Sequence, residues 1–371
     1  MEKFSTWRDA SSGIQPFLPP TPSRKDSDTV TKIIILFEYI LKAILGILKL
    51  LLVLAATILL FIIVDIVGFT LTPIKPVHRI FHYLFTSILT RLILFFMGFY
   101  WIHSEAVSSL TKGRGAPKTR ERTKKGGVDT GDVIVCNWTS YVEIFYLAFR
   151  FDPIFTQYYP ATNTLRPISL WKAIWTTGSY PNLGPPIGIE TFTLQELVNY
   201  AKTNQSKPIV IFPEGTTSNG RALLKFNPIF KDISIPVKNF KIHIFTVRYE
   251  FENFSPTFTV GNKFWHFIKL CCQFINILQV RSLISDESSF SRYSAPTAQS
   301  SAVPEDIIGS QVLDYMSQVG RLRKTGLGMV EKKGFLDFYK KRASGYAKKN
   351  RLEGMSELKI EQEIYVIFTL K

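Results

Sequence analysis

The stretch CNWTSYVE, residues 136 to 143, lies between two apolar runs of different character. The run Val133 to Val135 before it favours a strand, and residues 144 to 149 after it favour a helix. A turn from a strand into a helix directs its side chains into the cleft at the end of a sheet. We therefore interpret this stretch as a candidate active-site turn, although Trp138 cannot abstract a proton.

Two further strand-like runs follow, at Ile209 to Phe212 and at Ile242 to Val247. Helix-length stretches separate the runs, notably Leu194 to Lys202. This alternation predicts an α/β fold in which a mixed sheet is covered by helices.

The composition indicates contact with lipid and with negative charge. The chain has 371 residues, of which 46% are hydrophobic, a net charge of +16 and a mean hydropathy of +0.10, which is high for a soluble protein. The positive charge calls for an anionic partner, such as a membrane surface, a nucleotide thioester or nucleic acid. Three cysteines without metal-ligand spacing indicate a reducing compartment and no metal site.

An apolar segment without charge runs from Leu50 to Val64 and extends to Thr72 if Asp65 is tolerated. As a helix of about 34 Å it is long enough to cross a bilayer, although a buried helix of a soluble protein is the alternative. A second apolar stretch, from Phe81 to Trp101, has polar residues gathered on one face and is predicted to be amphipathic. Basic residues flank the first segment on both sides, so we expect either a hairpin or one spanning helix followed by an interfacial helix.

Residues 111 to 127, TKGRGAPKTRERTKKGG, carry seven basic residues and one glutamate. Such a run is either a solvated loop or a site for anionic lipid headgroups. Nucleic acid is the weaker interpretation, because no nucleic-acid-binding module accompanies the charge, and we expect none as a partner.

The strand at Ile209 leads into FPEGTTSNGRALLKF, residues 212 to 226. Gly215 and Gly220 allow a close backbone approach, and the residues between them offer hydrogen bonds. Arg221 and Lys225 are four residues apart, which is one face of a helix. The sequence predicts an anion-binding loop here, and a simple turn is the alternative.

These two stretches together resemble a known family. FPEGT matches the Phe-Pro-Glu-Gly-Thr motif of the glycerol-phosphate and lysophospholipid acyltransferase superfamily, and NWTSYVE lies upstream where the family has Asn-His-Thr-Ser-x-x-Asp. Residues 319 to 341 also resemble the closing helices of fungal members. The resemblance covers residues 80 to 345 and is closest to fungal lysophosphatidic acid:oleoyl-CoA acyltransferases.

The resemblance implies roles for the residues of the turn. In the family the His takes the proton of the acceptor hydroxyl and the Asp orients the His. Here Asn137 is retained, Trp138 stands at the His position and Glu143 at the Asp position. We predict Glu143 as the base and Trp138 as a wall that excludes water, while the alternative is that Glu143 caps the helix.

The resemblance also implies a substrate-binding set in the loop. We expect the acyl-CoA or phosphate contacts from Glu214, Gly215, Thr216, Thr217, Arg221 and Lys225. Arg221 and Lys225 are assigned to phosphate because Thr217 replaces an Arg that is frequent in the family. The second family motif should fall near PPIGIETFT, where Glu190 and Thr191 stand in place of an Arg.

The expected organisation has seven parts. They are a mobile tail (1–30), membrane-embedded or interfacial helices (31–105), a basic linker (106–130), the acyltransferase core (131–284), a flexible insertion (285–306), C-terminal helices (307–345) and a tail (346–371).

The function implied by the resemblance is transfer of an acyl chain from acyl-CoA, as co-substrate, to lysophosphatidic acid or a related lysophospholipid. No further cofactor is implied. The expected location is the endoplasmic reticulum membrane or a lipid droplet, with the catalytic domain facing the cytosol. The alternative is an inactive scaffold that keeps the acyltransferase fold.

Overall fold

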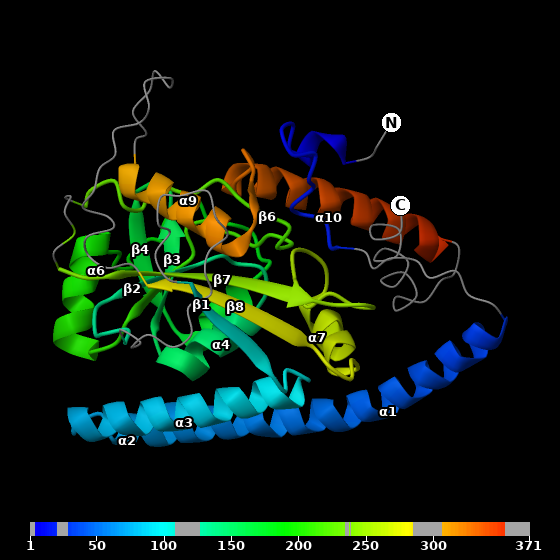
Figure 1. The fold of residues 1–371 in the computed structure, drawn as a ribbon, viewed down its shortest axis with the longest axis horizontal. Helices are drawn as coiled ribbons and strands as arrows, with labels where there is room; N and C mark the ends of the chain where they lie inside the picture. The colour runs from blue at the N-terminus through cyan, green and yellow to red at the C-terminus, as the bar shows by residue number, and fades with distance from the viewer. Residues whose placement is uncertain are drawn as a thin grey trace.

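The computed structural model describes residues 4–20, 29–107, 127–233, 237, 239–284 and 306–352. These residues form a seven-stranded sheet with the strand order β1-β8-β7-β2-β5-β3-β4 (Figure 1). Most of the predicted basic linker, the flexible insertion and the C-terminal tail lie outside the described residues.

The sheet is mixed, as predicted. β7, β2, β5 and β3 run parallel to one another, β8 is antiparallel to β7, and β4 is antiparallel to β3. The strands are β1 (Ile102–Val107), β2 (Val133–Cys136), β3 (Ile154–Tyr159), β4 (Thr164–Ile168), β5 (Ile209–Ile211), β7 (Ile242–Glu250) and β8 (Ile277–Ile284).

Strand β1 was not predicted, and it falls partly in the segment that we assigned to membrane helices. It pairs with β8 in parallel register, from Ile102 opposite Leu278 to Val107 opposite Leu283. Most of its residues are exposed, so backbone pairing rather than side-chain burial holds it. Because this edge strand has no apolar alternation, its sequence gave no strand signal.

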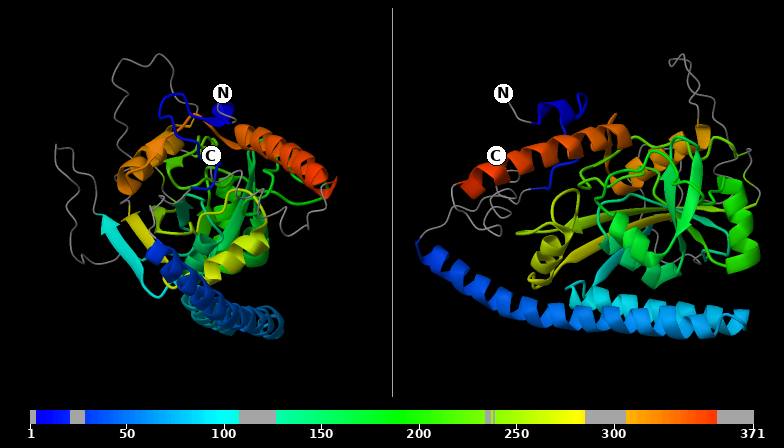
Figure 2. Two further views of the ribbon diagram at one scale, coloured as in Figure 1. Left: turned by 90° about the vertical axis from the view of Figure 1, so that its right-hand side faces the viewer. Right: turned by 180° about the vertical axis from the view of Figure 1, so that it is seen from behind.

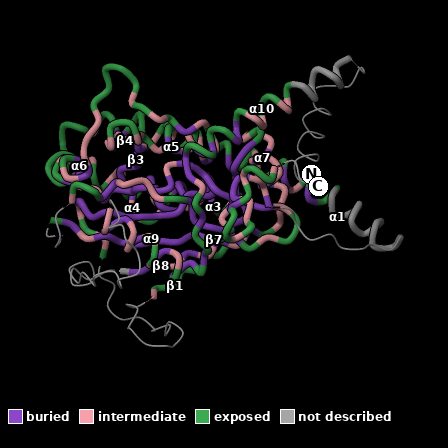
Figure 3. Tube along the Cα trace, turned by 90° about the horizontal axis from the view of Figure 1, so that it is seen from above, coloured by how far each residue is buried: buried purple, intermediate pink, exposed green. Residues whose placement is uncertain are grey.

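Alternate residues of β2 face two different cores. Ile134 and Cys136 pack with helix α4 (Val142–Phe151) and with the N-terminal helices. Val133 and Val135 pack with α6 (Leu194–Tyr200) and α9 (Ile307–Gly320). The buried residues accordingly follow the strands through the middle of the molecule (Figure 3). Burial on both faces explains why this central strand is a continuous apolar run.

The N-terminal helices form a long layer on one side of the sheet domain. α1 (Thr29–Leu60) continues through a π-helical turn (Phe61–Val67) into α2 (Gly68–Thr70), and α3 (Lys75–Phe96) returns beside it (Figure 1, Figure 2). Ile40–Thr70 and Lys75–Phe96 are each long and apolar enough to cross a membrane. The first helix therefore starts well before Leu50, where we placed the apolar segment.

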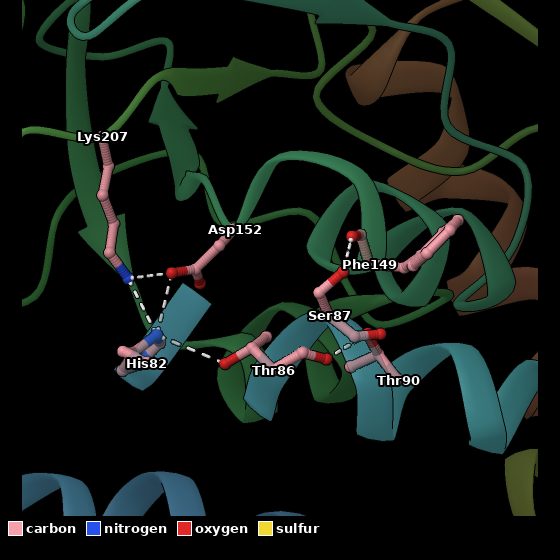
Figure 4. Close-up of polar contacts among 7 residues, drawn as sticks. All are labelled: His82, Thr86, Ser87, Thr90, Phe149, Asp152 and Lys207. Carbon is pink, nitrogen blue, oxygen red and sulfur yellow. Dashed lines mark hydrogen bonds and ion pairs between the residues drawn. The ribbon is translucent and has the colours of Figure 1, made fainter. Parts of the chain in front are cut away.

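Helix α3 is amphipathic, as predicted, and its polar side faces the protein. Thr86 and Thr90 are buried, whereas Leu84 and Ile88 are 48% and 54% exposed. Ser87 donates a hydrogen bond of 2.7 Å to the carbonyl oxygen of Phe149 in α4 (Figure 4). Leu84 and Ile88 mark an apolar side of α3 that no other described residues cover, whereas Leu89, Ile93 and Leu94 are buried.

A charged cluster joins α3 to the amino edge of the sheet. Asp152, at the end of α4, lies 2.8 Å from Nδ1 of His82 in α3 and 2.9 Å from Nζ of Lys207, which precedes β5 (Figure 4). Trp171 of α5 (Leu170–Thr176) makes a second polar tie, because its Nε1 donates to Asp65 in the π-helical turn at 2.8 Å. This contact gives Asp65, the one acidic residue within the first predicted apolar segment, a hydrogen-bond partner.

The opposite side of the sheet domain carries α9 and α10 (Met329–Leu352), and α10 continues past residue 345, where we placed the start of the C-terminal tail (Figure 1). Residues 4–20 lie against α10, although we predicted a mobile tail. Phe17 is buried among Leu224, Phe335 and Leu336, and Asn219 donates to the carbonyl oxygens of Gln15 and Leu18. The Ser- and Pro-rich composition suggested a solvated segment, but its aromatic residues provide a surface for docking.

Candidate active site

The turn and the loop that sequence analysis selected meet at the carboxyl edge of the sheet. β2 and β5 are adjacent and parallel, with Val135 opposite Ile211, so the residues that follow each strand emerge side by side. The backbone N–H of Ser218 donates to the carbonyl oxygen of Trp138 at 2.9 Å and ties the loop to the turn.

Asn137 holds the turn to the neighbouring strand. Its Nδ2 donates to the carbonyl oxygen of Val247 at 3.0 Å, and its Oδ1 accepts from the N–H of Val247 at 2.7 Å. The side chain is buried, and both of its polar atoms are used in this way. Asn137 therefore positions the turn rather than pointing a free group into a cleft.

Trp138 forms part of the wall of a small cavity. Its ring stacks on Phe212, with 4.8 Å between the ring centroids, and both rings line the cavity with Gly215 and Thr216. The cavity holds about 20 Å³, which is room for about one water molecule. The indole Nε1–H is buried and has no acceptor among the described residues. The site thus contains an unused hydrogen-bond donor at the position of the family's His.

Glu143 is buried behind the turn. Its Oε2 accepts from the backbone N–H groups of Thr139 at 2.8 Å and Ser140 at 3.2 Å, and its Oε1 accepts from the Thr139 hydroxyl. Burial raises the pKa of Glu143 to about 8, although these hydrogen bonds oppose the shift. The arrangement favours the capping role that the sequence left open, and Glu143 does not line the cavity beside Trp138.

Glu214 is fully buried within the loop, close to the hydroxyl of Ser218 and to the backbone of Leu224. Burial, and next the nearby Glu143, raise the pKa of Glu214 well above its ordinary value. The adjoining Thr217 is buried too, and its hydroxyl has no partner in the described structure.

The predicted binding residues of the loop separate into two groups. Gly215 and Thr216 line the cavity, whereas Arg221 and Lys225 are exposed and lie outside its wall. The segment that contains Arg221 and Lys225 is extended around β6 (Ala222–Leu223), so the helical face that we assumed for them is wrong. Their contact with phosphate stays a prediction.

Gly215 allows the start of α10 to pack closely against the loop. Its φ is +64°, and an added Cβ would lie 2.3 Å from Sδ of Met329 in α10. A side chain at this position would meet both strain and a clash. The loop is in this way fitted to the start of α10.

Part of the cavity wall was missed by sequence reasoning. Thr156, Gln157 and Tyr158 of β3 line it, as does the segment from Ser179 to Asn182 that follows α5. The composition of β3, IFTQYY, favours a strand. A strand that runs parallel to β2 and β5 should end at the same edge of the sheet as they do. The segment after α5 carries no comparable signal.

Comparison with known proteins relates the chain to acyltransferases. No protein-family profile matches it. It is 28% identical over 258 residues to lysophospholipid acyltransferase LPEAT1 of Arabidopsis thaliana, covering 66% of this chain and 60% of that protein. It is 25% identical over 247 residues to a Schizosaccharomyces pombe protein provisionally named a lysophosphatidic acid:oleoyl-CoA acyltransferase, covering 66% of this chain and 73% of that protein.

These relatives support the resemblance to the glycerol-phosphate and lysophospholipid acyltransferase superfamily. The two motif stretches, in the superfamily's order, lie side by side at the same edge of this chain's sheet. A solved structure of the acyltransferase PlsC from Thermotoga maritima covers 75% of this chain and 98% of its own, at 14% identity and a TM-score of 0.36. A similarity this low carries no argument about details of the site.

Two features that the resemblance led us to expect are replaced in this chain. The stretch expected to hold the second motif is a loop in which Ile187 is fully exposed and Gly188 has a φ of +78°. The described residues that line the cavity include no histidine that could replace the one expected at position 138. His243 pairs with Asp132 at 2.9 Å, as expected for a structural strand histidine.

Proposed function

We propose that the chain is a membrane-bound acyltransferase that moves a fatty acyl chain from acyl-CoA to lysophosphatidic acid or a related lysophospholipid. The sequence relationship to lysophospholipid acyltransferases supports this assignment. The observation that carries it is the joining of Trp138 and the FPEGT loop around one cavity.

Attachment to a membrane is supported by the uncovered apolar side of the N-terminal layer. Large apolar side chains of α1 and α3 are exposed there, including Ile44, Leu51, Leu84 and Ile88. A continuous apolar surface of this kind marks contact with a partner or with lipid. Lipid fits best, because both helices are long and apolar enough to enter a bilayer. We propose the endoplasmic reticulum or a lipid droplet, with the catalytic domain on the cytosolic side, where acyl-CoA is available.

The chemistry requires no dedicated base. The acceptor hydroxyl oxygen attacks the thioester carbonyl carbon, the carbon–sulfur bond breaks, and the hydroxyl proton ends on the thiol of coenzyme A. Holding the two reactants together is worth up to about 7 to 11 kcal/mol in the best cases, compared with 10²- to 10⁴-fold in rate for a typical general base.

Trp138 is assigned a role in this reaction. Its unpaired Nε1–H would donate a hydrogen bond to the carbonyl oxygen as negative charge develops there. The base role that we predicted for Glu143 would require its carboxylate to give up the donors of Thr139 and Ser140. We therefore propose that Glu143 fixes the turn that presents Trp138.

The rival function is a scaffold that keeps the fold and has lost the reaction. It is favoured by the small volume of the cavity and by the lack of a carboxylate or histidine among the described residues that line it. The two functions differ in one observable, the transfer of a labelled acyl group from acyl-CoA to a lysophospholipid by the purified protein. Product formation supports the enzyme, and background rates with several acceptors support the scaffold.

A further inference from the structure

A second, larger cavity lies between α7 (Lys263–Cys271) and α10. Its volume is about 460 Å³, within the range of small-molecule sites. Four Phe, Tyr and Trp rings line it, those of Tyr180, Phe258, Trp265 and Tyr339. The amino groups of Lys269 and Lys340 stand among these rings. The wall thus combines stacking surfaces with positive charge.

The charge of this wall is of one sign. The described residues that line the cavity include no aspartate or glutamate. Nζ of Lys340 lies 4.2 Å from the centre of the Tyr180 ring, and Nζ of Lys269 lies 5.9 Å from the centre of a ring of Trp265. Burial lowers the pKa of Lys269. An anionic ligand beside this amino group would offset the cost of its burial.

Trp265 gives a second indication of a ligand. Its indole Nε1–H is buried and has no acceptor among the described residues. Leaving such a donor unpaired costs about 1 to 3 kcal/mol. A ligand that offers an acceptor to this N–H would therefore bind more tightly.

The larger cavity adjoins the one beside Trp138. Ser179 and Tyr180 line both of them. A ligand seated in the larger cavity could therefore extend a narrow arm past these two residues to Trp138. α10 lies on the opposite side of the molecule from α1 and α3 (Figure 1, Figure 2), so this wall of the cavity is remote from the apolar layer.

We propose that the larger cavity binds the nucleotide end of the acyl donor, with adenine against the aromatic rings and the phosphates at Lys269 and Lys340. This inference rests on the proposed function. The flexible arm of coenzyme A then passes Ser179 and Tyr180 and brings the thioester to Trp138. An acyl chain or a membrane lipid fits less well, because the two amino groups line the wall.

A binding measurement tests the site without catalysis. Adenosine 3′,5′-bisphosphate, the phosphorylated nucleoside of coenzyme A, is titrated by calorimetry into the full chain in detergent. Lys269→Ala/Lys340→Ala should raise the Kd about 100-fold, at about tenfold for each charged contact. Trp265→Phe, which keeps a ring and removes the N–H, should raise it about fivefold.

The matched control is Lys333→Ala/Lys341→Ala, which removes the same charge from exposed positions of α10 that do not line the cavity. It should bind the probe like the unmodified chain. Equal affinity in the two double variants, or no binding to the unmodified chain, would overturn the proposal.

Steady-state kinetics separate this proposal from the proposed function. The Lys269→Ala/Lys340→Ala variant should raise the KM for acyl-CoA and leave the KM for the lysophospholipid unchanged. Probe binding without acyl transfer would keep the nucleotide site and reject the enzyme. Acyl transfer with an unchanged KM for acyl-CoA in this variant, or a raised KM for the lysophospholipid alone, would keep the enzyme and reject the nucleotide site.

Discussion

At the scale of single residues, Trp138 offers a sharp substitution. Trp138→Phe keeps an aromatic ring to stack on Phe212 and removes the unpaired Nε1–H. If this group donates to the thioester oxygen in the transition state, kcat should fall by about 10²-fold with little change in either KM. Initial rates over a matrix of donor and acceptor concentrations measure both constants. An unchanged kcat would remove Trp138 from the reaction.

Glu143 gives a prediction on stability against pH. Its pKa is about 8 in the folded chain and 4.5 as its ordinary value, so the folded state binds the proton more tightly. This contribution to the free energy of unfolding is fully present below about pH 4.5 and is lost as pH rises through about 8. Glu143→Gln keeps the shape and removes the titration, so its stability relative to the unmodified chain should increase between these values.

Thermal unfolding of both proteins in detergent from pH 5 to pH 8 measures the difference. Glu143→Ala is the contrasting variant, because it leaves the buried N–H groups of Thr139 and Ser140 without an acceptor, and it should lose about 2 to 5 kcal/mol. A constant difference between Glu143→Gln and the unmodified chain at every pH would reject the raised pKa. A 10²-fold loss of kcat in a stably folded Glu143→Gln would restore Glu143 as the base.

The sequence identified which residues of the turn matter but not how they are used. Trp138 and Glu143 were selected as a pair because the family places two catalytic residues there. The structure separates them, since Trp138 lines the cavity and Glu143 lies behind the turn. Two readings of Glu143 were open in the sequence, because capping and base catalysis both require a carboxylate near the start of a helix.

At the scale of elements, helix α3 is the most informative. Leu84→Lys/Ile88→Lys places charge on its uncovered apolar side and should release a large part of the protein from membranes, because each charge is costly in hydrocarbon. Asn199→Lys/Asn204→Lys, which adds the same charge at exposed positions of the sheet domain, serves as the control. Flotation with vesicles measures the bound fraction. Full retention of the α3 variant would argue against lipid contact on this side.

The N-terminal segment gives a second prediction at this scale. The side-chain Nδ2 of Asn219 donates to the carbonyl oxygens of Gln15 and Leu18 at 2.7 and 2.9 Å. Its backbone N–H donates to the carbonyl oxygen of Pro16 at 2.8 Å. Asn219→Ala removes the two side-chain bonds and should make residues 4–20 cleave faster in limited proteolysis. Asn199→Ala, an exposed residue of α6, should leave the rate unchanged. Equal cleavage in both variants would show that aromatic packing alone holds the segment.

Elements with strong periodicity were predictable, whereas those held by tertiary contacts were not. β2, β5 and β7 are buried apolar runs and were found from sequence. β1 is polar and exists through its pairing with β8, and residues 4–20 are held by aromatic contacts with α10. The sequence also did not show which face of α3 packs against the protein, because a helix between protein and lipid can bury its polar face.

At the scale of the whole molecule, the sheet brings the two motif stretches together, and the helical layers lie on opposite sides of it. Adjacent parallel strands β2 and β5 deliver the two motif stretches to one edge. The apolar layer of α1 and α3 lies on one side and α10 on the other (Figure 1). Lipid is expected to approach from the first side and the nucleotide of acyl-CoA from the second.

The central claim is that this chain transfers acyl groups although Trp138 stands at the position where the acyltransferase superfamily has a His. The most direct measurement uses the full chain, purified in detergent and reconstituted into vesicles, with acyl-CoA labelled in the acyl group and lysophosphatidic acid as acceptor. We predict labelled phosphatidic acid and an equal amount of free coenzyme A thiol, both reduced about 10²-fold in Trp138→Phe. Labelled product at the background level, with lysophosphatidic acid and with other lysophospholipids, would contradict the account.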